Sequence, residues 1–261
     1  MIWDWDPVAL SLGPVEIRWY GMLFAAAFVI GYHLMVLMSR WEGRDPAPLE
    51  RLFAFAVVGT LVGARLGHCL AYDPQWYLAH PWEILKIWEG GLASHGGAVG
   101  LVGGILLARL RHPQVDVVWI VYRLPVPAGL GGALIRLGNF WNSELVGMPT
   151  SVPWAVVFAR VDMVPRHPVQ LYEALTYAAV AVALGVIYVL RPRWRDLSLG
   201  LFLVAVFGSR IVWEAFKTPQ AMTDAVSGVR MGQILSVPFV VLGVALVVWQ
   251  WRRMGRCVRG A

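Results

Sequence analysis

The sequence predicts an all-α polytopic membrane protein with about seven transmembrane helices, a small head outside the membrane and an interfacial arm. Of the 261 residues, 58% are hydrophobic and only 15% are charged, whereas a soluble domain carries about 25% charged residues. Several apolar runs reach the roughly 20 residues that cross a bilayer as a helix. The 14 tryptophans are typical of chains whose aromatic side chains settle at membrane interfaces.

Seven segments carry the apolar pattern of a membrane-spanning helix. They are residues 18–38, 52–72, 92–110, 115–135, 170–190, 197–214 and 232–250. Because seven such helices use most of the chain, we expect a single membrane domain over residues 1–261.

Arginines indicate how these helices are oriented. Twelve of the 22 Lys and Arg residues follow the first, third, fifth and seventh helices, and cytoplasmic loops are enriched in such residues. We therefore expect the N-terminus outside and the C-terminus in the cytoplasm. The same placement at helix ends argues against nucleic-acid binding, although the net charge is +6. Residues 1–14 are acidic and do not resemble a cleavable signal peptide.

Two segments are expected outside the membrane. Residues 73–90 contain Trp76, Tyr77, Trp82 and Trp88, which predicts an interfacial arm at headgroup depth. Residues 136–169 form the longest soluble segment, and its prolines flank the apolar run 154–158. This pattern predicts a small β-containing head outside the membrane.

The most polar stretch beside the predicted helices begins at Arg136. Its guanidinium can donate two parallel hydrogen bonds to two oxygens of one phosphate. Asn139 and Asn142 can donate hydrogen bonds to a lipid headgroup, and Glu144 can orient an arginine or accept a proton. The structural alternative is an Arg–Glu ion pair that closes a loop.

His95 opens the third predicted helix within a run of glycines. Its ring can give or take a proton near neutral pH. The glycines allow close approach of another backbone or a headgroup. The structural alternative is a glycine-rich helix-packing site with a hydrogen-bonded histidine.

Arg210 and Glu214 lie four residues apart on one helix face and can pair. Arginine inside a membrane helix usually faces a cavity or a partner, so Arg210 is a functional candidate. Arg65 is interpreted as lining the same cavity. Gln170 and Glu173 share a face at the start of the fifth helix, where capping is the structural alternative.

Metal and cofactor chemistry is not indicated. The six histidines do not cluster and no HExxH motif is present. Cys69 and Cys257 are too few for a disulfide framework. We expect no cofactor.

Several blocks together resemble one family along essentially the whole chain. The run Arg136-Leu137-Gly138-Asn139-Phe140 with Asn142, Glu144 and Gly147 resembles the signature of bacterial prolipoprotein diacylglyceryl transferase. Other matching blocks are Ile17–Gly21, Gly90–Gly97, Arg166–Glu173 and Met231–Ser236. The resemblance implies a multi-pass protein of the bacterial inner membrane, with seven helices, a periplasmic head and an arm.

The family's reaction moves a diacylglyceryl group from phosphatidylglycerol to the lipobox cysteine of a prolipoprotein signal peptide. The products are a thioether-linked lipid and glycerol phosphate. The implied catalytic residues are His95, Arg136, Glu144 and Arg210, with His95 as the candidate base. The residues expected to bind substrate are Tyr20, Asn139, Asn142, Gly147, Arg136, Gln170 and Glu214.

The sequence also departs from the family pattern. Ile135 stands where a glycine is common, and Lys217 stands where an arginine is common. The segment from Gly147 to Arg166 is short for the family's head. A divergent paralogue with another lipid donor or acceptor therefore remains an alternative, as does a small membrane transporter, although no inverted repeat is visible.

Overall fold

The computed structural model describes all residues except 14, 72–73, 87–90, 92, 220–229 and 260–261, and it does not describe the side chains of residues 15, 94–95 and 255–259. The described chain divides into two compact units. Unit 1 combines Met1–Gly31 with Val121–Ala261, and unit 2 is Tyr32–Ile120.

All seven predicted segments are helical. The helices are α1 (Trp19–Trp41), α2 (Ala47–Ala71), α4 (Ser94–Arg111), α5 (Val117–Arg123) with α6 (Pro125–Trp141), α7 (Val169–Leu190), α8 (Ser198–Glu214) and α10 (Met231–Arg259). Within the described chain, five helices are long and apolar enough to cross a membrane, or six if α5 and α6 form one span. The polytopic membrane fold is confirmed, but the count of seven spans is not.

The difference in count comes mainly from α4, which is helical but is not among these candidate spans. Its 18 residues include five glycines and two arginines. One of the five candidate spans, Pro192–Glu214, consists of the 3-10 helix η3 (Pro192–Leu197) followed by α8.

The predicted fourth helix is broken at Leu124, where α5 and α6 meet at an angle of 53°. Pro125 lacks a backbone N–H and is suited to the first position of a new helix. The helix α6 then continues to Trp141. Arg136 and Asn139 therefore lie in the last turns of a helix, inside the segment expected to be soluble.

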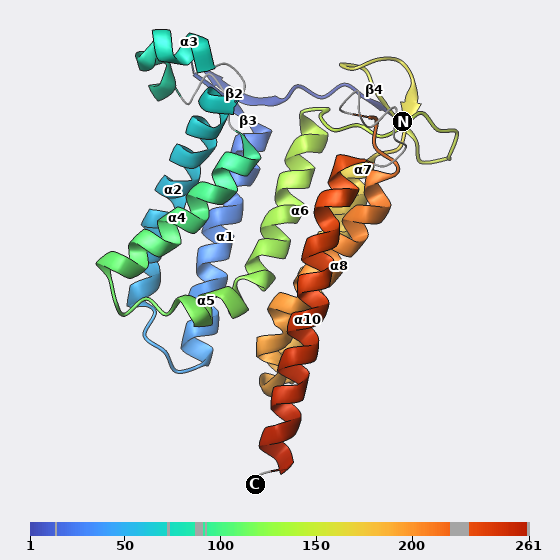
Figure 1. Cartoon of the computed structure of the whole chain (residues 1–261). Helices are drawn as coiled ribbons and strands as arrows, with labels where there is room; N and C mark the ends of the chain where they lie inside the picture. The colour runs from blue at the N-terminus through green and yellow to red at the C-terminus, as the bar shows by residue number, and fades with distance from the viewer. Residues whose placement is uncertain (14, 72–73, 87–90, 92, 220–229, 260–261) are drawn as a thin grey trace. The chain divides into compact units, whose positions relative to one another are not determined.

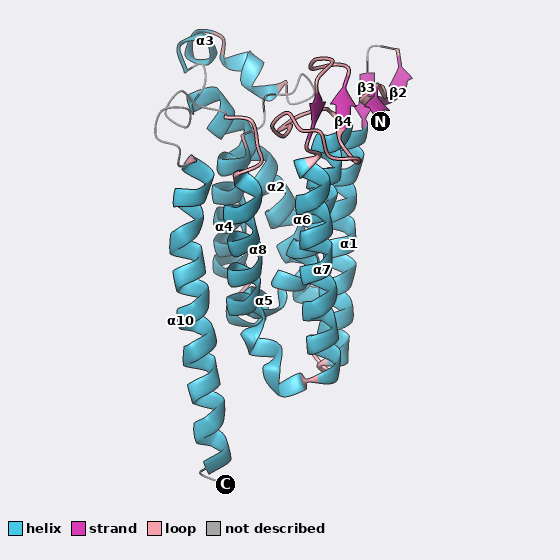
Figure 2. Ribbon diagram, turned by 90° about the vertical axis from the view of Figure 1, so that its right-hand side faces the viewer, coloured by secondary structure: helices cyan, strands magenta, loops and turns pink. Residues whose placement is uncertain are grey.

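Unit 2 is built on α2 and α4, which lie side by side (Figure 2). Their contact is made by glycine backbones. A Cβ atom on Gly63 would lie 2.6 Å from Gly100 Cα, and one on Gly67 would lie 2.7 Å from Gly96 Cα. The structural alternative for the glycines around His95, close helix packing, is thus borne out.

The expected arm contains two short helices, α3 (Pro74–Ala79) and η1 (Pro81–Leu85). Trp76 and Trp82 are exposed, while Trp88 lies outside the described residues. Arg65 of α2 is buried, and its guanidinium donates to the carbonyl oxygens of Glu83, Ile84 and Gly91. Arg65 thus anchors the arm to α2.

In unit 1, α6, α7, α8 and α10 run alongside one another (Figure 1). Ala133, Tyr177 and Val206 form a buried cluster where α6, α7 and α8 meet. This packing brings the end of α6, the start of α7 and the end of α8 together.

A small three-stranded sheet covers that end of unit 1. Strand β4 (Val156–Phe158) pairs in parallel with β1 (Ile2–Trp3) and antiparallel with β5 (Pro165–Arg166). Trp3 and Phe158 pack against Phe140 of α6 in one buried cluster. The predicted β-structure is present, and an N-terminal strand completes its sheet. A separate hairpin joins β2 (Val8–Leu12) and β3 (Val15–Arg18).

Candidate functional site

The loop that follows α6 has an unusual backbone. Ser143 and Leu145 both have φ of +56°, a left-handed conformation that is uncommon outside glycine and that clusters at functional sites. The N–H of Glu144 donates to Asn139 O at 2.9 Å. This turn folds the loop back and sets the Glu144 carboxylate beside the end of α6.

A continuous chain of charged side chains links α6, α7 and α8. Arg136 Nε lies 3.1 Å from Glu173 Oε2. Lys217 Nζ donates to Glu173 Oε1 at 3.0 Å and to Glu214 Oε2 at 2.8 Å. Arg210 Nε lies 4.0 Å from Glu214 Oε2. We call these five residues the Arg136 network.

The residues in the middle of the Arg136 network are buried, whereas those at its two ends are more exposed to solvent. The side chains of Glu173 and Lys217 are 1% and 4% exposed, whereas those of Arg136 and Arg210 are 14% and 36% exposed. Buried charges of this kind require partners. Three cations against two carboxylates leave one positive charge in excess, with a guanidinium at each end. An excess of positive charge with partly exposed arginines favours the binding of an anion.

Glu144 is bound by amides rather than by an arginine. Asn139 Nδ2 donates to one of its carboxylate oxygens at 3.0 Å, and Asn142 Nδ2 donates to the other at 3.1 Å. Asn139 in turn accepts a hydrogen bond from Arg136 at 3.3 Å. The carboxylate partner of Arg136 is Glu173, so an Arg136–Glu144 pair is not the contact that closes this loop. Glu144 is exposed, and water screens its charge more than those in the network.

Gln170 connects this loop to α7. It is fully buried, and its Nε2 donates to Glu144 O at 2.6 Å. Among the described residues, seven buried side-chain polar atoms lack a hydrogen-bond partner, and four lie here: Asn142 Oδ1, Ser143 Oγ, Gln170 Oε1 and Arg210 Nε. Buried polar atoms are normally paired, so their concentration marks this region as one suited to a polar ligand.

Tyr20 of α1 belongs to the same region. Its ring packs on Gly138, where a Cβ atom would lie 2.7 Å from Tyr20 Cδ2. The Tyr20 hydroxyl also interacts electrostatically with the charges of Arg136 and Glu144.

Gly147, expected to bind substrate, is enclosed by backbone. Its N–H donates to His167 O at 3.1 Å, and a Cβ atom there would clash with that oxygen. Its carbonyl oxygen accepts from Arg166 Nη1 at 3.1 Å. A hydrogen bond from Arg166 holds the pKa of Asp162 below its usual value, and the same contact raises the pKa of Arg166. Gly147 therefore holds the loop against the segment that leads into α7.

Glu214 and Arg210 pair more weakly than their spacing predicts, because the nearer cation to Glu214 is Lys217. A Cβ atom on Gly232 of α10 would lie 2.6 Å from the Glu214 carboxyl carbon. Gln233 Nε2 donates to Ile211 O at 2.9 Å. The start of α10 thus packs directly on the end of α8.

His95 lies in the first turn of α4, but its side chain is outside the described part of the structure. It belongs to unit 2, whereas Arg136 and Arg210 belong to unit 1. A cavity shared by the three remains a hypothesis.

The centre of the network is not evident from the sequence. There, Lys217 stands out only as a departure from a family pattern, and Glu173 only as a residue on one face of a helix. The usable signal was the spacing Arg210-x-x-x-Glu214-x-x-Lys217, which places three charges on one side of a helix end. In the described part of the chain, no group of three or more His, Cys, Asp or Glu is placed to hold a metal ion.

Comparison with known proteins decides the family. Residues 7–249 match the family model described as prolipoprotein diacylglyceryl transferase. The chain belongs to this family. A phosphatidylglycerol–prolipoprotein diacylglyceryl transferase of Tolumonas auensis is 47% identical over 257 residues, covering 98% of this chain and 100% of that protein.

Two further relatives carry the same name. The one from Chloroherpeton thalassium is 44% identical and covers 95% of this chain and 93% of its own. The one from Porphyromonas gingivalis is 42% identical and covers 94% and 93%. The family predicted from the signature at Arg136 is therefore confirmed, and with it membership of a transferase family.

Proposed function

We propose that this protein transfers the diacylglyceryl group of phosphatidylglycerol to the lipobox cysteine of a prolipoprotein, the first step of lipoprotein maturation. The observation that carries the proposal is the Arg136 network, which ends in two guanidiniums and carries excess positive charge. Phosphatidylglycerol presents one phosphodiester anion to such a site. Membership of the family, with relatives named for this reaction, supports the same substrates.

In the proposed reaction, the cysteine sulfur attacks the carbon of the diacylglycerol unit that bears the phosphate, and glycerol phosphate is the leaving group. A carbon–sulfur bond forms as the carbon–oxygen bond breaks, and the electron pair leaves on a phosphate oxygen. The thiol must lose its proton for this attack, and His95 is the proposed acceptor. Arg136 and Arg210 stabilise the departing phosphate, and donors aimed at developing charge contribute on the order of 3–4 kcal/mol each.

Glu173, Glu214 and Lys217 hold the two arginines in position. Glu173 holds Arg136 through its Nε at 3.1 Å. Asn139 holds Arg136 from its other side. Tyr20, Asn142 and Gln170 complete the proposed headgroup site.

The test is an assay with phosphatidylglycerol vesicles and a lipobox peptide. We expect a thioether product with the unaltered protein and a loss of at least a hundredfold in Arg136→Ala, since one such donor is worth that much. Arg160→Ala is the matched control, because Arg160 is exposed and forms only a 3.7 Å ion pair with Asp6. Equal activity of the two variants would contradict the role of Arg136.

The same assay separates the alternatives. Product from phosphatidylethanolamine but not from phosphatidylglycerol would identify a paralogue with another lipid donor. Full activity in His95→Gln would show that His95 is not the base. A transporter would yield no thioether with either lipid.

We further propose a location in the bacterial inner membrane, with the N-terminus periplasmic and the C-terminus cytoplasmic. Residues 73–90 would form the periplasmic arm and residues 136–169 the periplasmic head. A single cysteine at Leu12, exposed in the β2–β3 hairpin, tests this in a chain that lacks Cys69 and Cys257. Labelling of intact spheroplasts by an impermeant maleimide is expected; protection until lysis would reverse the orientation.

A further inference from the structure

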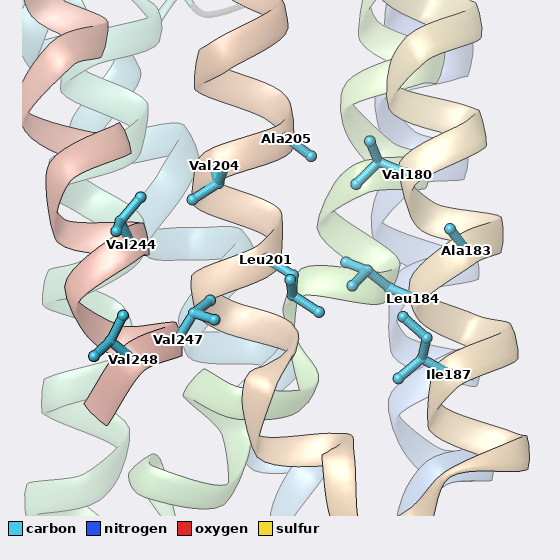
Figure 3. A pocket seen from close by; sticks show the side chains of 10 residues that line it. All are labelled: Val180, Ala183, Leu184, Ile187, Leu201, Val204, Ala205, Val244, Val247 and Val248. Atoms are coloured by element: carbon cyan, nitrogen blue, oxygen red, sulfur yellow. The ribbon is translucent and has the colours of Figure 1, made fainter. Parts of the chain in front are cut away.

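An apolar groove lies between α7, α8 and α10 of unit 1 (Figure 3). Its volume is about 410 Å³, and ten side chains line it, every one of them Val, Ala, Leu or Ile. A polar ligand would lose its hydrogen bonds in such a lining. The groove is therefore suited to a hydrocarbon chain.

The groove is distant from the Arg136 network. Its residues on α7 run from Val180 to Ile187, which lie about 10 Å and 21 Å along the helix from Glu173, at 1.5 Å per residue. On α8 the groove begins at Leu201, near the start of the helix, whereas Glu214 is the last residue of α8. The groove thus occupies the opposite membrane half from the network.

One side of the groove is open to the membrane. Val244 and Val248 of α10 line it and keep 48% and 42% of their surface exposed. Because α10 is a candidate membrane span, this exposed side meets the acyl chains of lipids.

A basic and aromatic rim lies one helical turn beyond the groove. Trp194 of η3 and Trp251 of α10 have ring centroids 5.9 Å apart, so the two elements meet there. Arg191 lies over the Trp194 ring at 5.8 Å. The described residues 191–197 and 249–254 contain five arginines, Arg191, Arg193, Arg195, Arg252 and Arg253.

Only one acidic residue accompanies these arginines in the two stretches, and it is already engaged. Asp196 Oδ1 accepts from Arg123 Nη1 at 2.5 Å. Arg191 and Arg252 are both exposed. The rim therefore has a strong excess of positive charge at the depth where tryptophans meet lipid headgroups.

We propose that the groove and this rim together bind one phospholipid with an anionic headgroup, in the leaflet opposite to the Arg136 network. An acyl chain lies between α7, α8 and α10, and the phosphate lies among Arg191, Arg252 and their neighbours. The charge of the rim selects the headgroup, and the groove selects a lipid over a soluble phosphate. This site does not depend on the proposed transferase reaction, and an inactive protein would keep it.

The experiment counts lipids retained by the purified full chain in native mass spectrometry. The probes are phosphatidylglycerol, phosphatidylcholine with the same acyl chains, and soluble glycerol phosphate. We expect Arg191→Gln/Arg252→Gln to retain one phosphatidylglycerol fewer and to weaken its binding roughly tenfold or more, since each arginine acts on the anionic headgroup. Phosphatidylcholine binding stays unchanged, and glycerol phosphate does not compete.

The matched control is Arg40→Gln/Arg111→Gln, which removes two exposed arginines from helix ends of unit 2. The groove is tested separately by Ala205→Phe, which fills it and leaves the arginines intact, and the same lipid should be lost. If Ala205→Phe does not fold, the arginine pair decides alone, because both residues are on the surface. Equal retention of the two lipids, or equal loss in the control, would overturn the proposal.

Discussion

Two helix interfaces in this protein are built on opposite principles. In unit 2, α2 and α4 meet through glycine backbones, with Gly63 and Gly100 in direct apposition. In unit 1, the ends of α6, α7 and α8 meet through charged side chains, from Arg136 through Lys217 to Arg210. Small residues let membrane helices approach closely and gain packing energy. Charges at membrane depth cost energy and are usually retained for function.

The difference teaches which interface to associate with chemistry. The described contact between α2 and α4 is made by glycine backbones, so its role is to hold the two helices together. The charged interface is costly unless every partner is present. It also leaves two arginines partly open at its ends. Substitutions in the first interface should therefore affect folding, and substitutions in the second should affect activity.

The largest effect is expected from Gly100→Leu. A Cβ atom at Gly100 would lie 2.8 Å from Gly63 Cα, so α2 and α4 must separate. Overpacking costs about 1–3 kcal/mol where neighbouring side chains can move aside. The cost here is larger, because the atoms that would be displaced belong to the backbone of α2. We expect a loss of most folded protein, measured by size-exclusion chromatography in detergent.

Gly103→Ala is the matched control on the same helix, because nothing lies within 4 Å of a Cβ atom there. It should fold normally and gain up to about 1 kcal/mol of helix propensity. Equal yields of Gly100→Leu and Gly103→Ala would show that the close approach is unimportant.

Lys217→Met should give the next largest effect. It leaves the Glu173 and Glu214 carboxylates without their shared cation, and breaking a buried pair costs about 3–5 kcal/mol. We expect transferase activity to fall by at least a hundredfold, with Lys217→Arg restoring part of it. Lys86→Met is the control, because its pair with Glu83 is partly exposed. Activity of Lys217→Met at the level of that control would contradict a positioning role.

A smaller effect separates the two asparagines. Asn139 contacts both Arg136 and Glu144, whereas Asn142 Nδ2 contacts Glu144 alone. A hydrogen bond to a charged group is worth about 1.5–3 kcal/mol. Asn139→Ala should therefore reduce kcat about tenfold to a hundredfold, and Asn142→Ala by less. The reverse order in steady-state kinetics would mean that Glu144, and not Arg136, is the group being positioned.

The smallest effect concerns pH and lies in unit 2. The backbone N–H of Trp119 donates a hydrogen bond to the Asp116 carboxylate, and Arg44 donates another. Together these hydrogen bonds hold the pKa of Asp116 below its usual value of 3.8. The stabilisation is thus fully present above pH 3.8 and is lost as the pH falls through the lowered pKa. Asp116→Asn keeps a capping side chain but should flatten this dependence. Melting temperatures between pH 7 and pH 3 measure it; parallel curves for both proteins would refute it.

The outcome of the helix predictions follows from what each pattern encodes. Apolar length alone located all seven helical segments, because a membrane helix must satisfy its backbone internally and cover itself with apolar side chains. It could not locate the break at Leu124, since Pro125 is compatible with either a kink or a new helix start. It also assigned Arg136 to a soluble loop, although α6 continues to Trp141.

Sequence by itself determined the helical membrane fold, the family and most of the residues gathered around Arg136. Those features follow from the composition, from the length and spacing of the apolar segments and from a local sequence signature, so they can be predicted without knowing any long-range contact. Only the tertiary structure decided how the charges pair. Glu173, Glu214 and Lys217 lie on segments up to 81 residues from Arg136, and pairing depends on distances of a few ångströms. The packing of α6, α7 and α8 sets those distances, and it makes Glu173, rather than the nearby Glu144, the partner of Arg136.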